Sequence, residues 1–312
     1  MAVRKMIKLE EQNRPGALSG IKVLDLGRMV AAPYCTMMLA NMGAQVIKIE
    51  QPVSGDISRV NLPMQNGEST YFIAYNCNKS GITADLKTER GKEILRRLIK
   101  WADVLVENFR PGVMERLGFG YEQAAQINPG IVYASISGYG QEGPFADRAA
   151  FDPIAQAMSG MVSVTGMPGG AKVRCGASIA DVLAGQNAAF AVLAALHYRE
   201  KSGQGQRIDV SLADSCISAM ASINQIYLTT GKVPEPLGNG FEASAPGNCY
   251  YTTDGSVMLL AGRNSEWVKL ARALGREDWL EDADFQNVCD RVKNREKLDR
   301  SEERRVGKEC RS

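Results

Sequence analysis

Hydrophobic and polar positions alternate with two different periods along the first two thirds of this 312-residue chain. Short apolar runs predict buried strands, whereas apolar positions at helical spacing, with charges opposite, predict amphipathic helices. Residues 21–27 and 44–50 are two such apolar runs, and a helical segment that begins near Pro33 and stops at Gly43 separates them. A strand, a helix and a strand in this order form a βαβ unit, so a parallel sheet is expected to begin here.

The same alternation continues up to about residue 215. Further strands are predicted at 82–86, 104–108, 131–137 and within 206–214, and helices from Thr88, at 113–117, at 152–158 and at 177–202. This order predicts an α/β fold with a Rossmann-like, mostly parallel sheet and helices on both faces. The turn after the first strand lacks the G-x-G-x-x-G pattern, so a dinucleotide phosphate cradle is not supported.

The long apolar segment at 177–202 is entered through one carboxylate, Asp181, and ends at Gly203. Two interpretations of Asp181 are open. Aspartate is a preferred N-cap, and the positive end of the helix dipole stabilises its ionised form. The same dipole could instead hold a carboxylate ionised where it attacks an acyl group.

The composition of the chain changes near Gly231. A Pro/Gly-rich stretch precedes two short strands joined at Asp254-Gly255, and a helix is predicted at 266–274. We therefore expect a large domain at 1–230 and a smaller, incomplete α+β domain at 231–299. Residues 300–312 carry charge without periodicity, and we interpret them as a non-native or disordered tail that resembles a translated adapter.

The composition of the chain argues against several classes of function. The net charge of +2 comes entirely from residues 300–312, so the neutral body gives no support for nucleic-acid binding. Seven cysteines without CxxC spacing and the absence of a signal sequence indicate a reducing cytoplasm. No window appears long enough to predict a membrane span. The single histidine, His197, leaves little room for a metal site or a histidine-based nucleophile.

Several segments, in this order and spacing, resemble the class III CoA-transferases, the CaiB/BaiF-like family of formyl-CoA transferase and carnitine CoA-transferase. The segments are 23–33, 43–52, 76–88, 102–113, 138–160 and 179–187. The resemblance extends without a gap from residue 18 to about 215. It implies an enzyme that moves CoA from an acyl-CoA donor to a small organic acid.

Several roles follow from the resemblance alone. Asp181 stands at the position of the family's nucleophile, which forms an aspartyl anhydride and then an aspartyl-CoA thioester. No permanently bound cofactor is implied, because coenzyme A is a substrate, and the family forms interlocked homodimers. The implied coenzyme A contacts are Val30, Ala31, Gln51, Ala84, Asp85, Leu86, Lys87, Asn108, Phe109, Arg110, Arg116, Ala149, Ala150, Phe151 and Asp152. Backbone N–H groups of Gly138 to Gly140 or of Gly238 to Gly240 are candidates to stabilise oxyanions.

Two departures keep alternatives open. Oxalate-type members carry Gln where this chain has Val30, which favours a bulkier or less polar acyl group. Related acyl-CoA racemases carry His before an aspartate, whereas Phe151 precedes Asp152 here. A racemase or epimerase would therefore lack one of its two bases. Because the chain is expected to stop inside the small domain, an inactive, truncated CoA-binding fragment is a further alternative.

Overall fold

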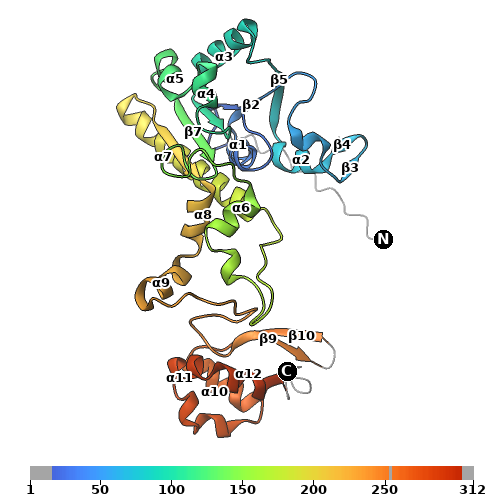
Figure 1. The fold of residues 1–312 in the computed structure, drawn as a ribbon, viewed down its shortest axis with the longest axis vertical. Coiled ribbons are helices and arrows are strands. Elements are labelled where there is room, and N and C mark those ends of the chain that lie inside the picture. Colours follow the sequence, from blue (N-terminus) through green and yellow to red (C-terminus); the bar gives the residue numbers. More distant parts are fainter. Residues whose placement is uncertain (1–15, 253–254, 304–312) are drawn as a thin grey trace. The chain divides into compact units, whose positions relative to one another are not determined.

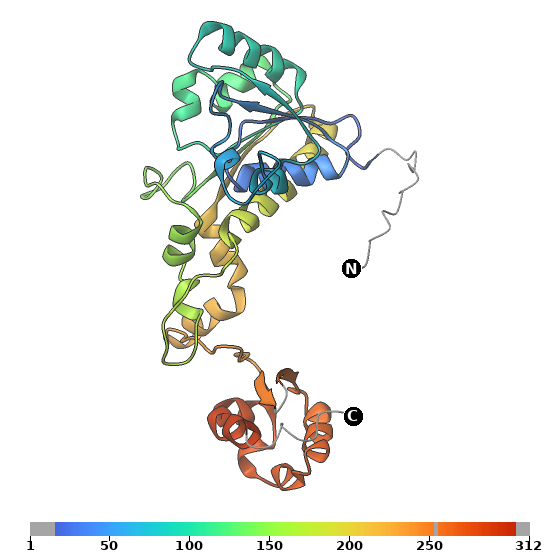
Figure 2. The same ribbon diagram turned by 90° about the vertical axis from the view of Figure 1, so that its right-hand side faces the viewer.

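The computed structural model describes residues 16–252 and 255–303, which form two compact units (Figures 1 and 2). The first unit contains the chain up to Ser159 together with Gly176–Ala219, and the second contains Gly160–Cys175 and the chain from Met220 onward. The division expected between residues 230 and 231 stays a prediction.

The first unit is built on a six-stranded sheet in which every neighbouring pair is parallel, as the alternating pattern predicted. The strand order is β5-β2-β1-β6-β7-β8. The strands are β1 (Lys22–Asp25), β2 (Gln45–Glu50), β5 (Lys79–Thr83), β6 (Val104–Glu107), β7 (Val132–Ser137) and β8 (Arg207–Ser211). The α/β, Rossmann-like fold is thereby confirmed.

Strand β5 differs from its prediction, because it begins at Lys79 and ends at Thr83 instead of covering 82–86. The first residues of β5 are polar and its side chains are largely exposed, since β5 forms an edge of the sheet. Hydrophobic patterning therefore could not find its start. Pairing with β2 places Lys79 opposite Val46 and starts the strand there.

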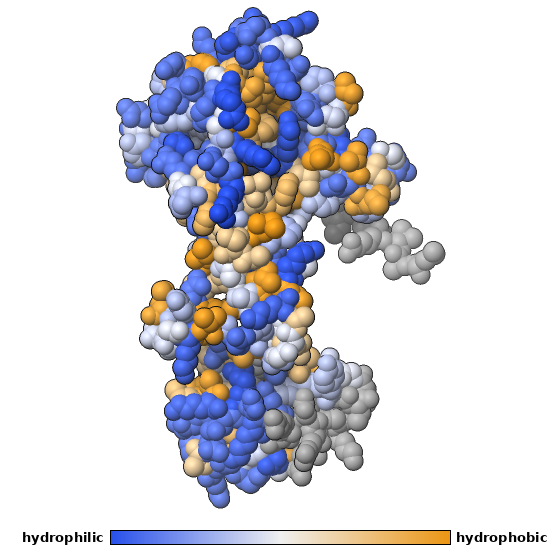
Figure 3. Space-filling view, viewed as in Figure 1, coloured by the Kyte–Doolittle hydropathy of each residue, from blue (hydrophilic) through white to orange (hydrophobic). Residues whose placement is uncertain are grey.

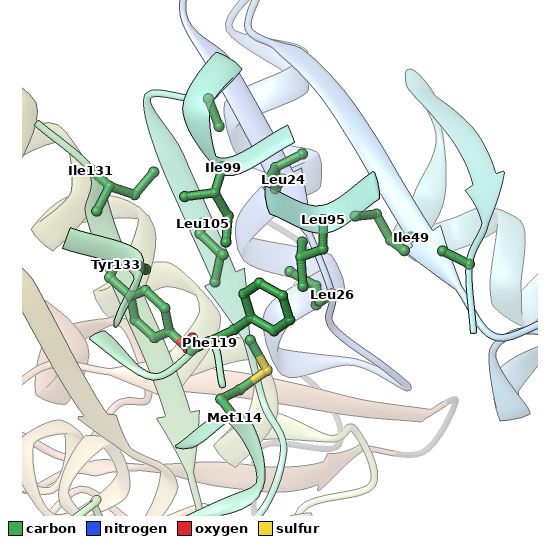
Figure 4. Close-up of a cluster of buried hydrophobic side chains, with 13 residues drawn as sticks. Leu24, Leu26, Ile49, Leu95, Ile99, Leu105, Met114, Phe119, Ile131 and Tyr133 are labelled. Carbon is green, nitrogen blue, oxygen red and sulfur yellow. The ribbon is translucent and has the colours of Figure 1, made fainter. Parts of the chain in front are cut away.

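Helices cover both faces of this sheet (Figure 2). Helices α1 (Ala31–Asn41) and α7 (Ile179–Ser202) pack together on one face, and α3 (Glu89–Trp101) and α5 (Tyr121–Ile127) lie on the other. Between α3 and the sheet lies an apolar core, which includes Leu95, Ile99, Leu105 and Tyr133 (Figure 4).

The long helix α7 carries a stripe of buried small residues that allows close packing on α1. A Cβ added to Gly185 would lie 2.6 Å from the carbonyl oxygen of Ala31, so the backbones of the two helices approach closely near their N-terminal ends. Against the expectation from sequence, α7 is long and apolar enough to cross a membrane by composition. Its buried residues pack against α1 and the sheet, as those of a core helix do.

Shorter elements complete the first unit. They are the hairpin β3 (Met64–Gln65) and β4 (Glu68–Ser69), and helices α2 (Thr70–Asn76), α4 (Val113–Leu117), α6 (Asp152–Met158) and α8 (Leu212–Ala219). Apolar side chains lie exposed around this hairpin and α2, where Figure 3 shows a hydrophobic surface.

The second unit has its own small core. Its elements are α9 (Ala221–Thr230), the antiparallel pair β9 (Gly247–Thr252) and β10 (Gly255–Leu260), α10 (Asn264–Ala273), α11 (Val288–Lys293) and α12 (Arg295–Glu303). Trp267 and Trp279 stack with ring centroids 5.3 Å apart in the centre. Helix α12 includes residues 300–303, and the remainder of the expected tail lies outside the described residues.

Candidate active site

The loops that follow β1, β6 and β7 border a cavity of about 460 Å³ at the carboxyl edge of the sheet, next to the start of α7. Ligands of open α/β sheets bind at this edge. The cavity brings together ten of the candidate residues, which are Val30, Ala31, Asn108, Phe109, Arg110, Ala149, Ala150, Phe151, Asp152 and Asp181. All of its lining residues belong to the first unit.

Six other candidates lie outside its lining: Gln51, Ala84, Asp85, Leu86, Lys87 and Arg116. Asp85 and Lys87 form a tight turn before α3, in which the Lys87 N–H donates to Asp85 Oδ1 at 3.0 Å. Contacts of these six residues with coenzyme A stay predictions.

A larger cavity of about 1040 Å³ lies in the second unit, but it contains none of the candidate catalytic or coenzyme A residues. Charged side chains of 293–297 form much of its wall, together with Gly238 and Gly240. We therefore assign the candidate active site to the smaller cavity, where a carboxylate and the strand ends meet.

Asp181 does not cap α7, so the capping interpretation is wrong. Ser178 is the N-cap residue but its side chain forms no capping hydrogen bond, and Asp181 is the third residue of the helix. The cap comes instead from Asp152, whose Oδ1 accepts the N–H of Ala180 at 2.7 Å. The other oxygen of Asp152 accepts from Gln156 Nε2 at 2.7 Å, and the Asp152 side chain is buried.

This arrangement leaves the Asp181 carboxylate without a hydrogen-bond partner among the described residues, although it is half-buried. Burial, reinforced by the nearby charge of Asp152, raises the pKa of Asp181 to about 7. A carboxylate with a raised pKa is a stronger nucleophile than an ordinary one once it is ionised. Asp181 is thus free to react instead of being held in a structural bond.

Two tyrosines that sequence reasoning missed stand beside this carboxylate. The hydroxyl of Tyr71 forms a hydrogen bond with Ser178, and the rings of Tyr71 and Tyr75 meet edge to face with centroids 5.3 Å apart. Burial, with a contribution from the charge of Asp181, raises the pKa of both phenols, so both remain neutral hydrogen-bond donors at neutral pH. Only the tertiary packing of α2 against α1 reveals them, because no spacing in the sequence links residues 71 and 181.

Three arginines line the cavity, and none of them forms an ion pair within the described ranges 16–252 and 255–303. Sequence reasoning found Arg110 but missed Arg28 and Arg148. The guanidinium of Arg28 lies 5.0 Å from the centroid of Phe109, and that of Arg148 lies 4.4 Å from Phe145. Arginines held on aromatic faces with free donors are suited to bind phosphate or carboxylate groups.

Asn108 has a structural use in addition to its predicted one. Its side-chain amide accepts the N–H of Arg28 at 2.8 Å and donates to the Arg28 carbonyl at 2.9 Å, which ties the loop after β6 to the loop after β1. Glu107, at the end of β6, accepts the N–H of Phe109 at 2.8 Å. Burial raises the pKa of Glu107 to about 7.

Within the residues that the structure describes, no group of three His, Cys, Asp or Glu side chains could hold a metal ion. Among the described residues, the lining of this cavity supplies the unbonded carboxylate of Asp181, the neutral phenol of Tyr71 and three arginines without ion-pair partners. Such a set suits covalent catalysis on an acyl group that arrives on an anionic carrier.

Comparison with known proteins identifies the family of this chain. The model of CoA-transferase family III matches residues 18–309. The chain is 37% identical over 93% of its length to a succinyl-CoA–D-citramalate CoA-transferase of Chloroflexus aurantiacus and spans 73% of that protein. It is 40% identical over 84% of its length to a succinate–glutarate CoA-transferase of Agrobacterium fabrum, of which it spans 68%. A CAIB/BAIF family protein from Brucella suis matches with a TM-score of 0.82 at 36% identity, covering 94% of this chain and 79% of that one.

Proposed function

This chain belongs to CoA-transferase family III, and from that membership we propose that Asp181 carries coenzyme A from an acyl-CoA donor to a carboxylic acid acceptor. The observation that carries the proposal is the free carboxylate itself. Asp152 supplies the cap of α7, so both oxygens of Asp181, at the edge of a cavity, have no hydrogen-bond partner in the described part of the chain. Burial makes that carboxylate a strong nucleophile.

The first half of the reaction removes CoA from the donor. An oxygen of ionised Asp181 attacks the thioester carbonyl carbon, the C–S bond breaks, and CoA leaves as the thiolate. The thiolate then attacks the carbonyl carbon of Asp181 in the mixed anhydride, which releases the donor acid as a carboxylate and leaves an aspartyl-CoA thioester. No proton enters or leaves in these steps, so no separate acid or base is needed.

The second half repeats the steps with the acceptor. The acceptor carboxylate attacks the aspartyl thioester, the thiolate leaves, and the thiolate then attacks the acyl carbon of the new anhydride. These steps release the acceptor as its CoA ester and restore Asp181. Coenzyme A is throughout a substrate and not a resident cofactor, and the arginines of the cavity are suited to bind its phosphates.

We extend the proposal to dicarboxylic acyl groups. The names of the two relatives specify succinyl-CoA, citramalate, succinate and glutarate. In this chain, Met29, Val30 and Ile57 provide an apolar wall for methylene groups, and Arg148 provides a cation for a second carboxylate. The bulkier acyl group expected from Val30 is compatible with a four- or five-carbon diacid.

Two further parts of the proposal concern assembly and location, and the first of them rests on the family resemblance. We propose an interlocked homodimer, which sedimentation should reveal as a species of twice the chain mass. We also propose a cytoplasmic location, consistent with the six free cysteines of the described part of the chain. A monomer at micromolar concentration would contradict the dimer.

The decisive test follows an isotope label. The protein is incubated with a panel of acyl-CoA esters and labelled free acids, and the label is expected to enter the ester pool. Hydroxylamine should trap the intermediate as a modified Asp181 that mass spectrometry detects. Incorporation of solvent deuterium at the α-carbon, without any acceptor acid, would instead identify an epimerase.

A further inference from the structure

Side chains from outside the turn hold the backbone of residues 27–29, which connects β1 to α1 and forms part of the cavity wall. Five of the six backbone N–H and C=O groups in these three residues are bonded to side chains. The bonds join Gly27 N–H to Asp25 Oδ1 (2.8 Å), Lys48 Nζ to Gly27 O (2.6 Å), Arg28 N–H to Asn108 Oδ1 (2.8 Å), Asn108 Nδ2 to Arg28 O (2.9 Å) and Met29 N–H to Asp56 Oδ1 (3.2 Å). Such a turn has very little freedom to move.

Three of these bonds come from a buried cluster of two lysines and two aspartates, Lys48, Lys79, Asp25 and Asp56. Their side chains are at most 2% exposed. Lys48 lies at the centre: its Nζ is 3.0 Å from Asp56 Oδ2 and 3.9 Å from Asp25 Oδ2. The contact of Asp56 Oδ2 with Lys48 is an ion pair, and no other described residue bonds to this oxygen. Lys79 Nζ completes the cluster at 2.8 Å from Asp25 Oδ2.

The turn itself is strained. Met29 has φ 62°, in the left-handed region that costs a non-glycine residue roughly 1–2 kcal/mol. Gly27 is packed so tightly that an added Cβ would lie 2.4 Å from the Cβ of Ala32. A strained conformation persists only where its surroundings over-determine it, and such conformations gather at functional sites.

Fold stability alone does not account for the cluster. Burying two ion pairs costs more desolvation than a well-packed apolar replacement would, so buried ion pairs are weak evidence of a stabilising role. What apolar side chains could not supply is a fixed cation beside the Gly27 carbonyl and a fixed anion beside the Met29 N–H. The cluster is therefore suited to positioning the backbone.

We propose that Lys48, together with Asp56, is a positioning residue for CoA transfer, because it fixes the Gly27–Met29 turn so that Met29 and Val30 form a rigid wall beside Asp181. This inference rests on the proposed function. A wall that is fixed in advance holds the thioester near the nucleophile without an ordering cost on binding.

Lys79 provides a matched control. It is equally buried and pairs with the same Asp25, but its other bonds go to the carbonyl of Pro33 and to Asn76, not to the turn. Lys48→Met and Lys79→Met therefore each remove one buried cation, and only Lys48→Met removes a bond to residues 27–29. Both variants should lower the melting temperature.

The experiment measures kcat/KM for the acyl-CoA and the calorimetric Kd for coenzyme A, well below the melting temperature of each variant. For Lys48→Met we expect kcat/KM to fall about 10- to 100-fold, since ångström-scale misplacement costs this much. For Lys79→Met we expect a change of about twofold or less at equal folded fraction. An equal loss in both variants would overturn the proposal.

Hydrogen exchange at the amides of Arg28 and Met29 tests the turn without any turnover. These amides should exchange slowly in the wild type and in Lys79→Met, and at least about tenfold faster in Lys48→Met. If Lys48→Met does not fold, Asp56→Asn replaces it, because Asn keeps the shape and the oxygen that Met29 needs but removes the charge paired with Lys48. Unchanged exchange at both amides would refute the positioning role.

The activity measurement tests the proposed function, and the hydrogen-exchange measurement tests the role of Lys48 separately. Absence of CoA transfer in the wild type would reject the proposed function, whereas the exchange rates and the CoA affinity would still decide whether Lys48 fixes the turn.

Discussion

Two buried aspartates behind the cavity wall, Asp25 and Asp56, differ from the aspartate in the cavity, Asp181, in the side chains that they contact. Asp25 and Asp56 lie beneath the cavity wall and face Lys48 and Lys79. Burial alone would raise the pKa of each aspartate, but the lysines outweigh it and hold both pKa values below the usual range. Asp181 is half-buried, forms no ion pair with any described residue, and has its pKa raised to about 7.

The comparison teaches that partners, and not burial, separate structural from reactive carboxylates here. Carboxylates that hold backbone are fully satisfied by cations and N–H groups. At Asp181 another side chain, Asp152, takes over the structural bond and leaves the reactive group unsatisfied. Neutralising Asp25 should therefore lower stability, whereas neutralising Asp181 should raise stability and abolish activity.

The largest effect is expected for Asp181→Ala. Loss of the only candidate nucleophile should reduce CoA transfer by about 10³-fold or more, while CoA binding and the circular dichroism spectrum remain. Asp214→Ala is the control, because Asp214 is an exposed aspartate in the first turn of another helix, α8. Label exchange that persists in Asp181→Ala would reject the mechanism.

Next in size is the stability loss in Asp25→Asn. Removing this charge leaves Lys79 buried without its anion, which should cost about 3 kcal/mol in urea unfolding at pH 7. Because the folded pKa of Asp25 is depressed, its contribution is present above its ordinary pKa of 3.8 and is lost as the pH falls through the folded value. The difference between wild type and Asp25→Asn should thus shrink in acid, and a constant difference would contradict the pairing.

Asp181→Asn should have the opposite effect on stability. The folded pKa of about 7 exceeds the ordinary 3.8, so the folded state holds an extra proton between these values and wild-type stability declines as pH rises through them. The neutral variant avoids this loss. A shift of this size is worth about 4 kcal/mol for a fully desolvated group, and partial exposure reduces the expected gain to about 2 kcal/mol at pH 8.

Thermal unfolding of wild type and Asp181→Asn from pH 4 to pH 8 checks this expectation. The two curves should coincide near pH 4 and separate up to about pH 7. Equal stability at pH 8 would show that Asp181 is not desolvated in the free protein.

Much of this framework could be predicted from the sequence. The parallel sheet followed from apolar runs separated by helical segments, and helices at 113–117 and 152–158 have the predicted bounds. These features are local, since burial of one face sets the period of each element. The resemblance to class III CoA-transferases, carried by residues 18 to about 215, is confirmed by the family match.

The wrong or missing parts all depend on tertiary contacts. The bond from Asp152 to Ala180 joins residues 28 positions apart, so the sequence of α7 alone suggested that Asp181 was its own cap. The two hydrogen bonds between Asn108 and Arg28 join residues that are 80 positions apart. The cluster around Lys48 was missed because a lysine within an apolar strand shows neither its burial nor its partners.

The value of kcat/KM should rise by about tenfold between pH 6 and pH 8. If transfer needs ionised Asp181, kcat/KM should rise between pH 6 and pH 8 with an apparent pKa near 7, because the ionised fraction rises from about a tenth to about nine tenths. Glu107 has a similarly raised pKa, so the measurement is repeated on Glu107→Gln. The inflection should remain in that variant, and its disappearance would assign the profile to Glu107.

The smallest effect is expected for Met29→Gly. Glycine relieves the left-handed strain of roughly 1–2 kcal/mol but makes the unfolded chain more flexible by about 1 kcal/mol, so the net stability should change by less than about 1 kcal/mol. Val53, at φ 73° with a fully exposed side chain, is the comparison, since Val53→Gly relieves strain at a residue that no buried cluster holds. A β-branched residue is disfavoured more strongly in this region, so Val53→Gly should be the more stabilising of the two. Urea unfolding measures the stability of both variants.

Met29→Gly should also raise KM for the acyl-CoA, because it removes a side chain from the cavity wall. An unchanged KM would mean that this wall does not contact the acyl group.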